Sequence, residues 1–252
     1  MTGSKIDKKE MSRMVGKIQN REIFIRQLSS RLQRLSTPVH VERPQWRYSP
    51  QHKTLQNLSQ DELLVILQKQ CTRINTNCVV TSSADLAMTL EKVIDDYDGG
   101  PIMTWQDERF DAFGLTELFS NTLPKKQIEL HTWDPTIGRD NIALVEKANI
   151  GITISDITLA ESGTAVLFSN PHHGRTVSFL PTKSIILIPK SSIVPRMTQA
   201  AIQIRERLQN GETLASCVNF ISGPSNSADI EMILVVGVHG PIYMTYIIID
   251  DL

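Results

Sequence analysis

The sequence is short of cysteine, carries almost no net charge and contains no long apolar run. Its three cysteines, Cys71, Cys78 and Cys217, form no C-x-x-C pair, which argues against a disulfide framework or a self-contained zinc or iron–sulfur site. The 26 basic and 27 acidic residues nearly cancel, which argues against a general nucleic-acid-binding protein. No apolar run reaches the roughly 18 residues of a membrane span, and no secretory apolar region opens the chain. We therefore expect a cytoplasmic protein without a membrane span.

Two nucleotide-binding motifs are also missing. No G-x-G-x-x-G follows a predicted strand, which disfavours a nicotinamide-dependent dehydrogenase of the Rossmann kind. No G-x-x-x-x-G-K-S is present, so a phosphate-binding loop is not predicted either. The 252 residues are nevertheless enough to bury a sizeable core.

Residues 1–58 differ in composition from the rest and are predicted to form a basic helix followed by an extended strap. Residues 1–40 hold nine Lys or Arg against three acidic residues. Apolar residues recur there at helical spacing and would form one apolar stripe, at Ile18, Ile23, Ile25, Leu28 and Leu32. A solvated basic helix, a docking arm and, more remotely, a nucleic-acid arm all fit this pattern.

The strap PQWRYSP cannot be helical throughout, because each proline disfavours helix in the residue before it. Trp46 and Tyr48 would face the same side of an extended segment. They would pack either on this chain's own body or on another subunit.

Residues 59–252 are predicted to form one α/β domain. Ser59 is expected to cap a first helix, and helical and extended stretches then alternate as far as the helix Ile142–Asn149. This alternation indicates right-handed crossovers and a mainly parallel sheet flanked by helices.

The pattern changes after Gly151. Ile154–Leu159, Thr164–Ser169 and Thr176–Leu180 are predicted as short strands joined by tight turns, which favours an antiparallel hairpin excursion. A buried strand at Ser184–Ile188, a helix ending at Gly211 and a closing strand at Tyr243–Ile249 would complete the domain.

The same region carries a family resemblance. The segments GITISDITLAESGT, GRTVSFLP, ISGPSNSADIE and GVHGP occur in an order that resembles the LutC/YkgG lactate-utilization family, whose domain is called LUD. The N-terminal IQNREIFIRQLSSRLQR and the strap RPQWRYSP resemble the Bacillus-type members, so the likeness covers nearly the whole chain.

This resemblance implies a NagB/RpiA/CoA-transferase-like fold and a role in oxidising L-lactate to pyruvate. It further implies two partner proteins that carry iron–sulfur centres. An isolated thiol cannot hold a cluster that needs about four cysteines, so no cofactor is expected in this chain itself.

Glu161 is the first candidate for chemistry, because it lies in a turn followed by Gly163 at the end of a predicted strand. CoA-transferases of the implied fold use a glutamate in a glycine-containing turn as the nucleophile, which is an analogy at the level of the fold. The alternative is that Glu161 accepts backbone hydrogen bonds within its own turn.

Several further residues are candidates for binding a small anion. Arg175 could clamp a carboxylate, or could form an ion pair with Glu161 or Asp156. The segment SGPSNS exposes N–H and hydroxyl donors near an expected helix start, which suits an anion, whereas Asp229 there would suit the helix dipole. The predicted anion-binding set is Arg175, Thr164, Ser222, Gly223, Ser225 and Asp229.

His239 lies in a Gly/Pro turn, where it could act as an acid, a base or a turn-stabilising hydrogen bonder. It joins Glu161 as a candidate catalytic residue. The adjacent pair His172 and His173 lacks nearby cysteines or a spaced carboxylate, so no metal site is predicted.

Two functional classes therefore remain open. The first is a subunit without a cluster in an L-lactate-oxidising system, which organises partners, binds a small anion, or both. The second is a free-standing acyl- or CoA-transfer enzyme centred on Glu161. A third interpretation, an ATP-dependent ligase of the formyltetrahydrofolate cyclo-ligase kind, is supported only by similarity at the level of the fold.

Overall fold

The computed structural model describes residues 18–34, 42, 44–228 and 232–252. The chain separates into two compact units, residues 1–48 and 49–252, and each is described by itself. In the part of the chain that the structure describes, no helix combines the length and the apolar character needed to cross a membrane.

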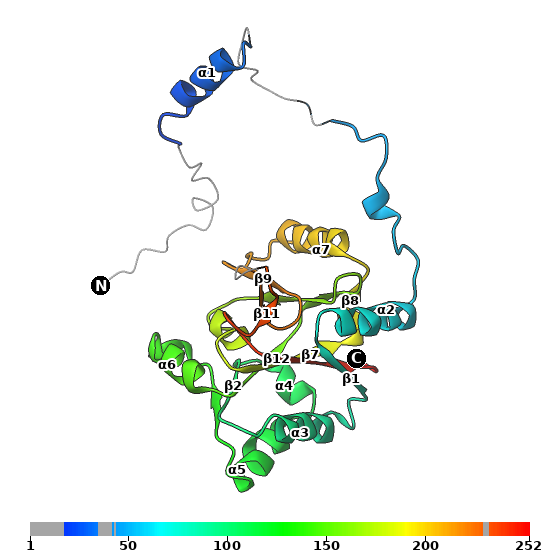
Figure 1. The fold of residues 1–252 in the computed structure, drawn as a ribbon, viewed down its shortest axis with the longest axis vertical. Helices are drawn as coiled ribbons and strands as arrows, with labels where there is room; N and C mark the ends of the chain where they lie inside the picture. Colours follow the sequence, from blue (N-terminus) through cyan, green and yellow to red (C-terminus); the bar gives the residue numbers. More distant parts are fainter. Residues whose placement is uncertain (1–17, 35–41, 43, 229–231) are drawn as a thin grey trace, which may run out of the picture. The chain divides into compact units, whose positions relative to one another are not determined.

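The first unit contains helix α1 (Arg21–Arg31), as the sequence predicted (Figure 1). Glu22 lies in its first turn and Arg31 in its last, and both charges suit the helix dipole. Of the predicted apolar stripe, Ile23 and Leu28 lie in this helix with their side chains exposed.

The second unit is built on a parallel sheet. Within the described residues it has six strands in the order β1-β12-β7-β4-β2-β3, and every neighbouring pair is parallel. The strands are β1 (Asn77–Thr81), β2 (Ile102–Thr104), β3 (Leu130–Thr132), β4 (Ile150–Ile154), β7 (Lys183–Pro189) and β12 (Tyr243–Ile249). The four inner strands β2, β4, β7 and β12 are almost wholly buried, as expected for a parallel sheet covered on both faces.

The direction of the chain across this sheet reverses between β2 and β4. From β2 the chain steps outward to the edge strand β3, then returns to β4 and continues in the opposite direction to β7. Such a reversal is the topological switch point at which open α/β sheets usually bind ligands, beyond the carboxyl ends of the strands.

The helices of this unit pack around its sheets. They are α2 (Gln60–Arg73), α3 (Leu86–Asp96), α4 (Arg109–Ala112), α5 (Leu123–Lys125), α6 (Asp140–Lys147) and α7 (Met197–Gln209), whose Ala200 packs on strands of the smaller sheet described below. Ser59 caps α2 as predicted, because its hydroxyl accepts from the Glu62 N–H while the Glu62 carboxylate accepts from the Ser59 N–H. In Figure 1, α3 and α5 lie below the sheet, and α7 lies above it.

A second, smaller sheet confirms the predicted antiparallel excursion. Its order is β8-β5-β6-β9, with β6 antiparallel to both β5 and β9. The strands are β5 (Ile157–Leu159), β6 (Thr164–Phe168), β8 (Ile193–Val194) and β9 (Val218–Ile221). A separate pair, β10 (Asn226–Ser227) and β11 (Val235–Val236), follows.

Two predicted strands are wrong. Ile154–Leu159 is not one strand, because the chain changes sheets in its middle: the Ser155 N–H donates to Leu187 O of the parallel sheet, and the Asp156 N–H donates to Val166 O of the smaller sheet. Thr176–Leu180 is not a strand either. Residues Arg175–Ser178 form the 3-10 helix η5, which is closed by local hydrogen bonds such as Phe179 N–H to Thr176 O.

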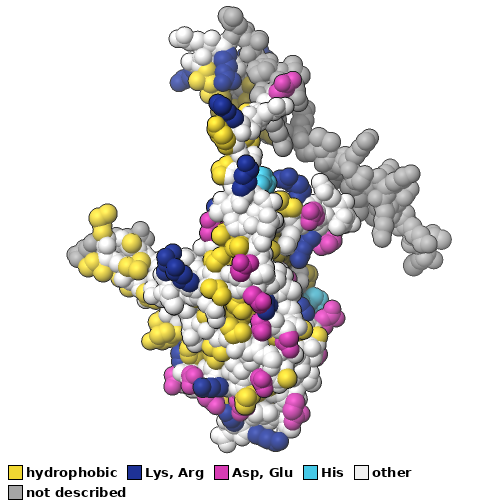
Figure 2. Space-filling model, turned by 90° about the vertical axis from the view of Figure 1, so that its right-hand side faces the viewer, with side chains coloured by type: hydrophobic (Ala, Val, Ile, Leu, Met, Phe, Trp, Pro, Cys, Tyr) yellow, Lys and Arg dark blue, Asp and Glu magenta, His cyan; other side chains and the backbone are white. Residues whose placement is uncertain are grey.

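Charges of both signs are mixed on the surface. On the face of the molecule that Figure 2 shows, Lys and Arg side chains lie among Asp and Glu side chains. The small net charge is therefore not the sum of two large opposite patches on that face.

Gly151 is required where η5 packs on β4. A Cβ added at this position would lie 2.1 Å from Val177 O. We expect Gly151→Ala to lower the free energy of unfolding by about 2–3 kcal/mol, since the backbone of η5 would have to move. Urea unfolding followed by circular dichroism measures this change. At Gly240 the nearest atom to an added Cβ is 3.2 Å away, so Gly240→Ala is the matched control. Equal effects of the two substitutions would contradict this account of the packing.

Candidate functional site

Polar side chains meet at the switch point. Asp107 lies three residues beyond the end of β2, and Asp156 lies two residues beyond the end of β4. Because β2 and β4 are parallel neighbours, their carboxyl ends bring these two acidic residues to the same edge of the sheet.

Arg109, the first residue of α4, connects the two carboxylates. Its Nε lies 3.0 Å from both Asp107 oxygens, its Nη2 lies 2.6 Å from Asp107 Oδ2, and its Nη1 lies 3.1 Å from Asp156 Oδ1. Asp156 Oδ2 also accepts from the Phe168 N–H at 3.2 Å. The guanidinium therefore joins the ends of β2 and β4, and Asp156 extends the connection to the end of β6.

The loop 170–174 covers this edge of the sheet and is held by two tryptophans. Trp105, after β2, donates from its indole to Gly174 O at 2.9 Å, and Trp133, after β3, donates to Pro171 O at 3.1 Å. A Cβ at Gly174 would meet the Trp133 ring at 2.3 Å, so this position requires glycine. The loop is thereby fixed above the strand ends.

His173 has a defined tautomer. Asn170 Oδ1 accepts from the backbone N–H groups of His172 and His173, at 2.8 and 2.9 Å, which directs Asn170 Nδ2 toward His173 Nδ1 at 3.0 Å. Because an amide NH₂ only donates, Nδ1 must accept and Nε2 carries the proton. That Nε2 lies 3.2 Å from Asp107 Oδ2, and the ring stacks on Trp105 with centroids 4.5 Å apart.

The environment of Asp107 favours its charged form. Its side chain is only 4% exposed, and burial by itself raises the pKa of this carboxyl. Hydrogen bonds from His173 and Arg109, together with the Arg109 charge, outweigh burial and hold the pKa far below its usual range. Asp107 therefore acts as a permanent anion at the centre of the cluster.

These groups line an open cleft of about 540 Å³. Gln106, Asp107, Glu108, Arg109, Asp156, Asn170, His172 and His173 form its walls. Among the described residues, no group of three or more His, Cys, Asp or Glu side chains is placed to hold a metal ion. The chemistry that the cleft offers is hydrogen bonding and charge.

Of the predicted site residues, Glu161, Thr164 and Ser222 lie near the turn between β5 and β6. The Glu161 carboxylate is 42% exposed and pairs with Arg196 Nε at 2.8 Å, which neither interpretation of this residue anticipated. The Thr164 hydroxyl lies 2.6 Å from the Ser222 hydroxyl.

The glycines near this turn pack against α2. A Cβ at Gly163 would lie 2.6 Å from Ile74 Cδ1, and one at Gly223 would lie 2.3 Å from Ile74 O. Both glycines also have positive φ, +65° and +74°, so close packing and a left-handed backbone together account for them.

The remaining predicted residues lie apart from this turn. Ser225 donates from its N–H to Pro241 O, and its hydroxyl accepts from the His239 N–H at 3.3 Å. Asn226 and Ser227 belong to β10, so the helix start expected there is wrong at these two residues. Asp229 lies outside the described residues.

Arg175 makes neither of its predicted ion pairs. Its guanidinium lies 5.5 Å from the centroid of the Phe179 ring, and its Nη1 lies 4.0 Å from Cys217 Sγ. Glu161 pairs with Arg196, and Asp156 pairs with Arg109.

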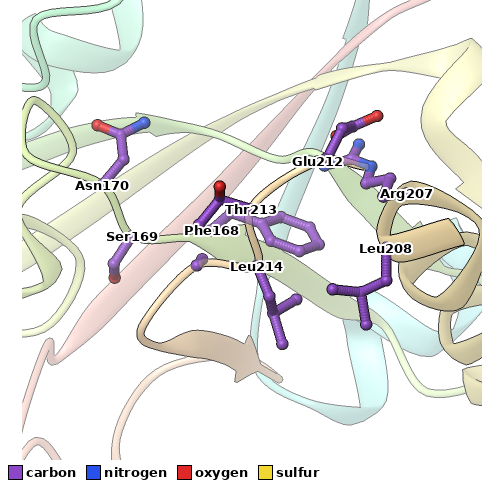
Figure 3. Close-up of a pocket in the computed structure, with 9 residues that line it drawn as sticks. Phe168, Ser169, Asn170, Arg207, Leu208, Glu212, Thr213 and Leu214 are labelled. Atoms are coloured by element: carbon purple, nitrogen blue, oxygen red, sulfur yellow. The ribbon is translucent and has the colours of Figure 1, made fainter. Parts of the chain in front are cut away.

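A second, smaller cavity of about 160 Å³ lies between the end of β6 and the end of α7 (Figure 3). Phe168, Leu208 and Leu214 supply apolar walls, and the Arg207 guanidinium lies 4.6 Å from the Phe168 ring centroid. It contains no cluster of titratable groups comparable to that of the cleft, so the cleft is the better candidate site.

The sequence contained a signal for the cleft. The segment WQDER directly follows β2 (Ile102–Thr104), and polar residues just beyond a parallel strand are typical of a site. The pairing of Asp107 with Asp156 could be recognised only once the strand order was known.

The fold and the cleft define an α/β protein with a mainly parallel sheet and a polar site at its switch point. The family model of the LUD domain matches residues 65–249, and the chain therefore belongs to the LUD domain family. A solved structure of a DUF162 family protein from Deinococcus radiodurans has the same fold, with a TM-score of 0.55 at 18% identity. The match covers 77% of this chain and 99% of that chain.

Relatives are similar over nearly the whole length. Lactate utilization protein C of Geobacillus sp. (strain WCH70) is 55% identical over 236 residues, which are 94% of this chain and 98% of that protein. Lactate utilization protein C of Bacillus subtilis (strain 168) is 48% identical, with the same shares covered. The predicted family resemblance is thus confirmed.

Asp107→Asn tests the cluster. We expect the free energy of unfolding at pH 7 to fall by about 2 kcal/mol, because Arg109 and His173 lose a charged acceptor. A lowered carboxyl pKa stabilises the fold above the pKa of the unfolded chain, so the difference from wild type should shrink below about pH 4. Urea unfolding at several pH values measures both effects. Asp96, exposed at the end of α3, provides the control Asp96→Asn, and a difference that grew toward low pH would contradict the assignment.

Proposed function

We propose that this chain is a subunit of a cytoplasmic system that oxidises L-lactate to pyruvate and allows growth on L-lactate as carbon source. The observation that carries the proposal is the 55% identity to a lactate utilization protein C over 98% of that protein's length. Similarity over both lengths supports a shared role more strongly than a shared domain would.

In this proposal the chain holds no redox cofactor, and two partner proteins carry the iron–sulfur centres. Three cysteines in the whole sequence are fewer than the four thiolates that a cluster needs. Cys71 is buried in α2, which further limits its use as an external ligand. The electrons of lactate oxidation would then pass through the partners, and this chain would position the partners, the substrate, or both.

The ion pair between Glu161 and Arg196 supports this proposal over acyl transfer. An ion pair with a guanidinium stabilises the resting carboxylate and so weakens it as a nucleophile, and Glu161 Oε2 accepts from Arg196 Nε at 2.8 Å. The pair instead connects the β5–β6 turn to the residue that precedes α7.

Growth on L-lactate tests the proposal. A strain lacking the gene should fail to grow on L-lactate and should grow normally on a sugar, and the wild-type gene should restore growth. Glu161→Gln should restore growth as well at matched protein abundance, because an amide keeps an oxygen that can accept from Arg196.

Two results would oppose this outcome. Normal growth of the deletion strain, with no second copy of the gene, would overturn the role in lactate use. Failure of Glu161→Gln alone would favour the acyl-transfer enzyme, for which hydroxylamine trapping of a glutamyl thioester is the direct measurement.

A further inference from the structure

Most polar groups of the cleft already have partners within the protein. Asp107 accepts from Arg109 and His173, and Asp156 accepts from Arg109 and the Phe168 N–H. His173 uses both ring nitrogens, one toward Asp107 and one toward Asn170. A ligand would have to bind through the groups that these contacts leave free.

Arg109 retains donors. A guanidinium carries five N–H groups, of which Nε, one on Nη1 and one on Nη2 have acceptors in Asp107 and Asp156. The other two N–H groups have no acceptor among the described residues, and the side chain is 30% exposed in the wall of the cleft. Arg109 can therefore donate to a further oxygen ligand.

His172 retains an acceptor. Its Nδ1 lies 2.8 Å from Gln106 Oε1, and the Gln106 N–H donates to His172 O at 3.3 Å, so the residue is held at two points. Since a carbonyl oxygen only accepts, Nδ1 carries the proton and Nε2 of the neutral ring presents a lone pair. The exposed ring lines the same cleft as Arg109.

A free donor pair and a free acceptor match a molecule with a carboxylate and a hydroxyl group. We propose that the cleft binds a small 2-hydroxy monocarboxylate, with Arg109 donating to the carboxylate and His172 Nε2 accepting from the hydroxyl. The choice of L-lactate as this ligand rests on the proposed function. A cleft of about 540 Å³ has ample room for a molecule of this size.

The hydroxyl contact predicts a ligand preference. Propionate has the carboxylate of L-lactate without its hydroxyl, and pyruvate has a carbonyl in place of the donor. Both should bind about five- to tenfold more weakly than L-lactate, because the His172 acceptor is left unpaired.

Glu108 should weaken the binding of a carboxylate. It lines the cleft, is exposed and carries a charge that repels a carboxylate. Glu108→Gln should therefore tighten L-lactate binding about two- to threefold at low ionic strength, and added salt should reduce the gain.

Isothermal titration calorimetry of the full chain with L-lactate, propionate and pyruvate tests the inference. His172→Asn can keep the donor to Gln106 while removing the Nε2 acceptor, so L-lactate should bind about five- to tenfold more weakly. His172→Gln returns an acceptor near that position and should recover part of the affinity. His52→Asn, a substitution of an exposed histidine outside the cleft, should leave binding unchanged.

Circular dichroism on each variant checks that the fold is kept. Absence of L-lactate binding at about 20 mM, equal affinity for propionate, or an unchanged affinity in His172→Asn would each overturn the inference. If the gene is required for growth but the chain does not bind L-lactate, the proposed function stands and this inference fails. If the chain binds L-lactate but the deletion strain grows normally, the proposed function fails instead.

Discussion

The passage of the chain from one sheet to the other at Ser155 and Asp156 is the constraint on which the rest of the structure depends. Consecutive N–H groups pair with different sheets there, Ser155 with Leu187 O and Asp156 with Val166 O. The change of sheet places the Asp156 carboxylate beside the end of β2, where Arg109 reaches it. A partly buried ion pair of this kind adds little net stability but is costly to break, so it fixes the relative position of the segments that it joins.

The glycine-rich turns and the cleft have different roles in this fold. Gly163 and Gly223 let two turns approach Ile74 at the end of α2, and Gly151 lets η5 lie on β4. The nearest atom is a backbone oxygen at Gly223 and Gly151 and a side-chain carbon at Gly163, so these glycines serve the packing of the fold. The groups available to a ligand are instead the side chains of Arg109 and His172 in the cleft.

The arrangement of the cleft suits binding more than chemistry by this chain alone. Asp107 and Asp156 both pair with Arg109, and His173 lies between Asp107 and Asn170, so these walls of the cleft are held in place by contacts within the protein. A site whose side chains are already held in place loses little conformational entropy when it binds and orients a ligand. Such a role agrees with a system in which other proteins supply the electron carriers, as we propose.

The sequence alone determined most element types, the parallel sheet with its antiparallel excursion, and the family, because these depend on local periodicity and on the order of short motifs. It also placed the Ser59 cap and the closing strand at Tyr243–Ile249. Only the tertiary structure decided that β4 and β5 belong to different sheets and that Asp107, Arg109 and Asp156 meet. Strand order and sheet exchange arise from contacts between residues far apart in the chain, such as the 47 positions that separate Arg109 from Asp156, and no local pattern encodes those contacts.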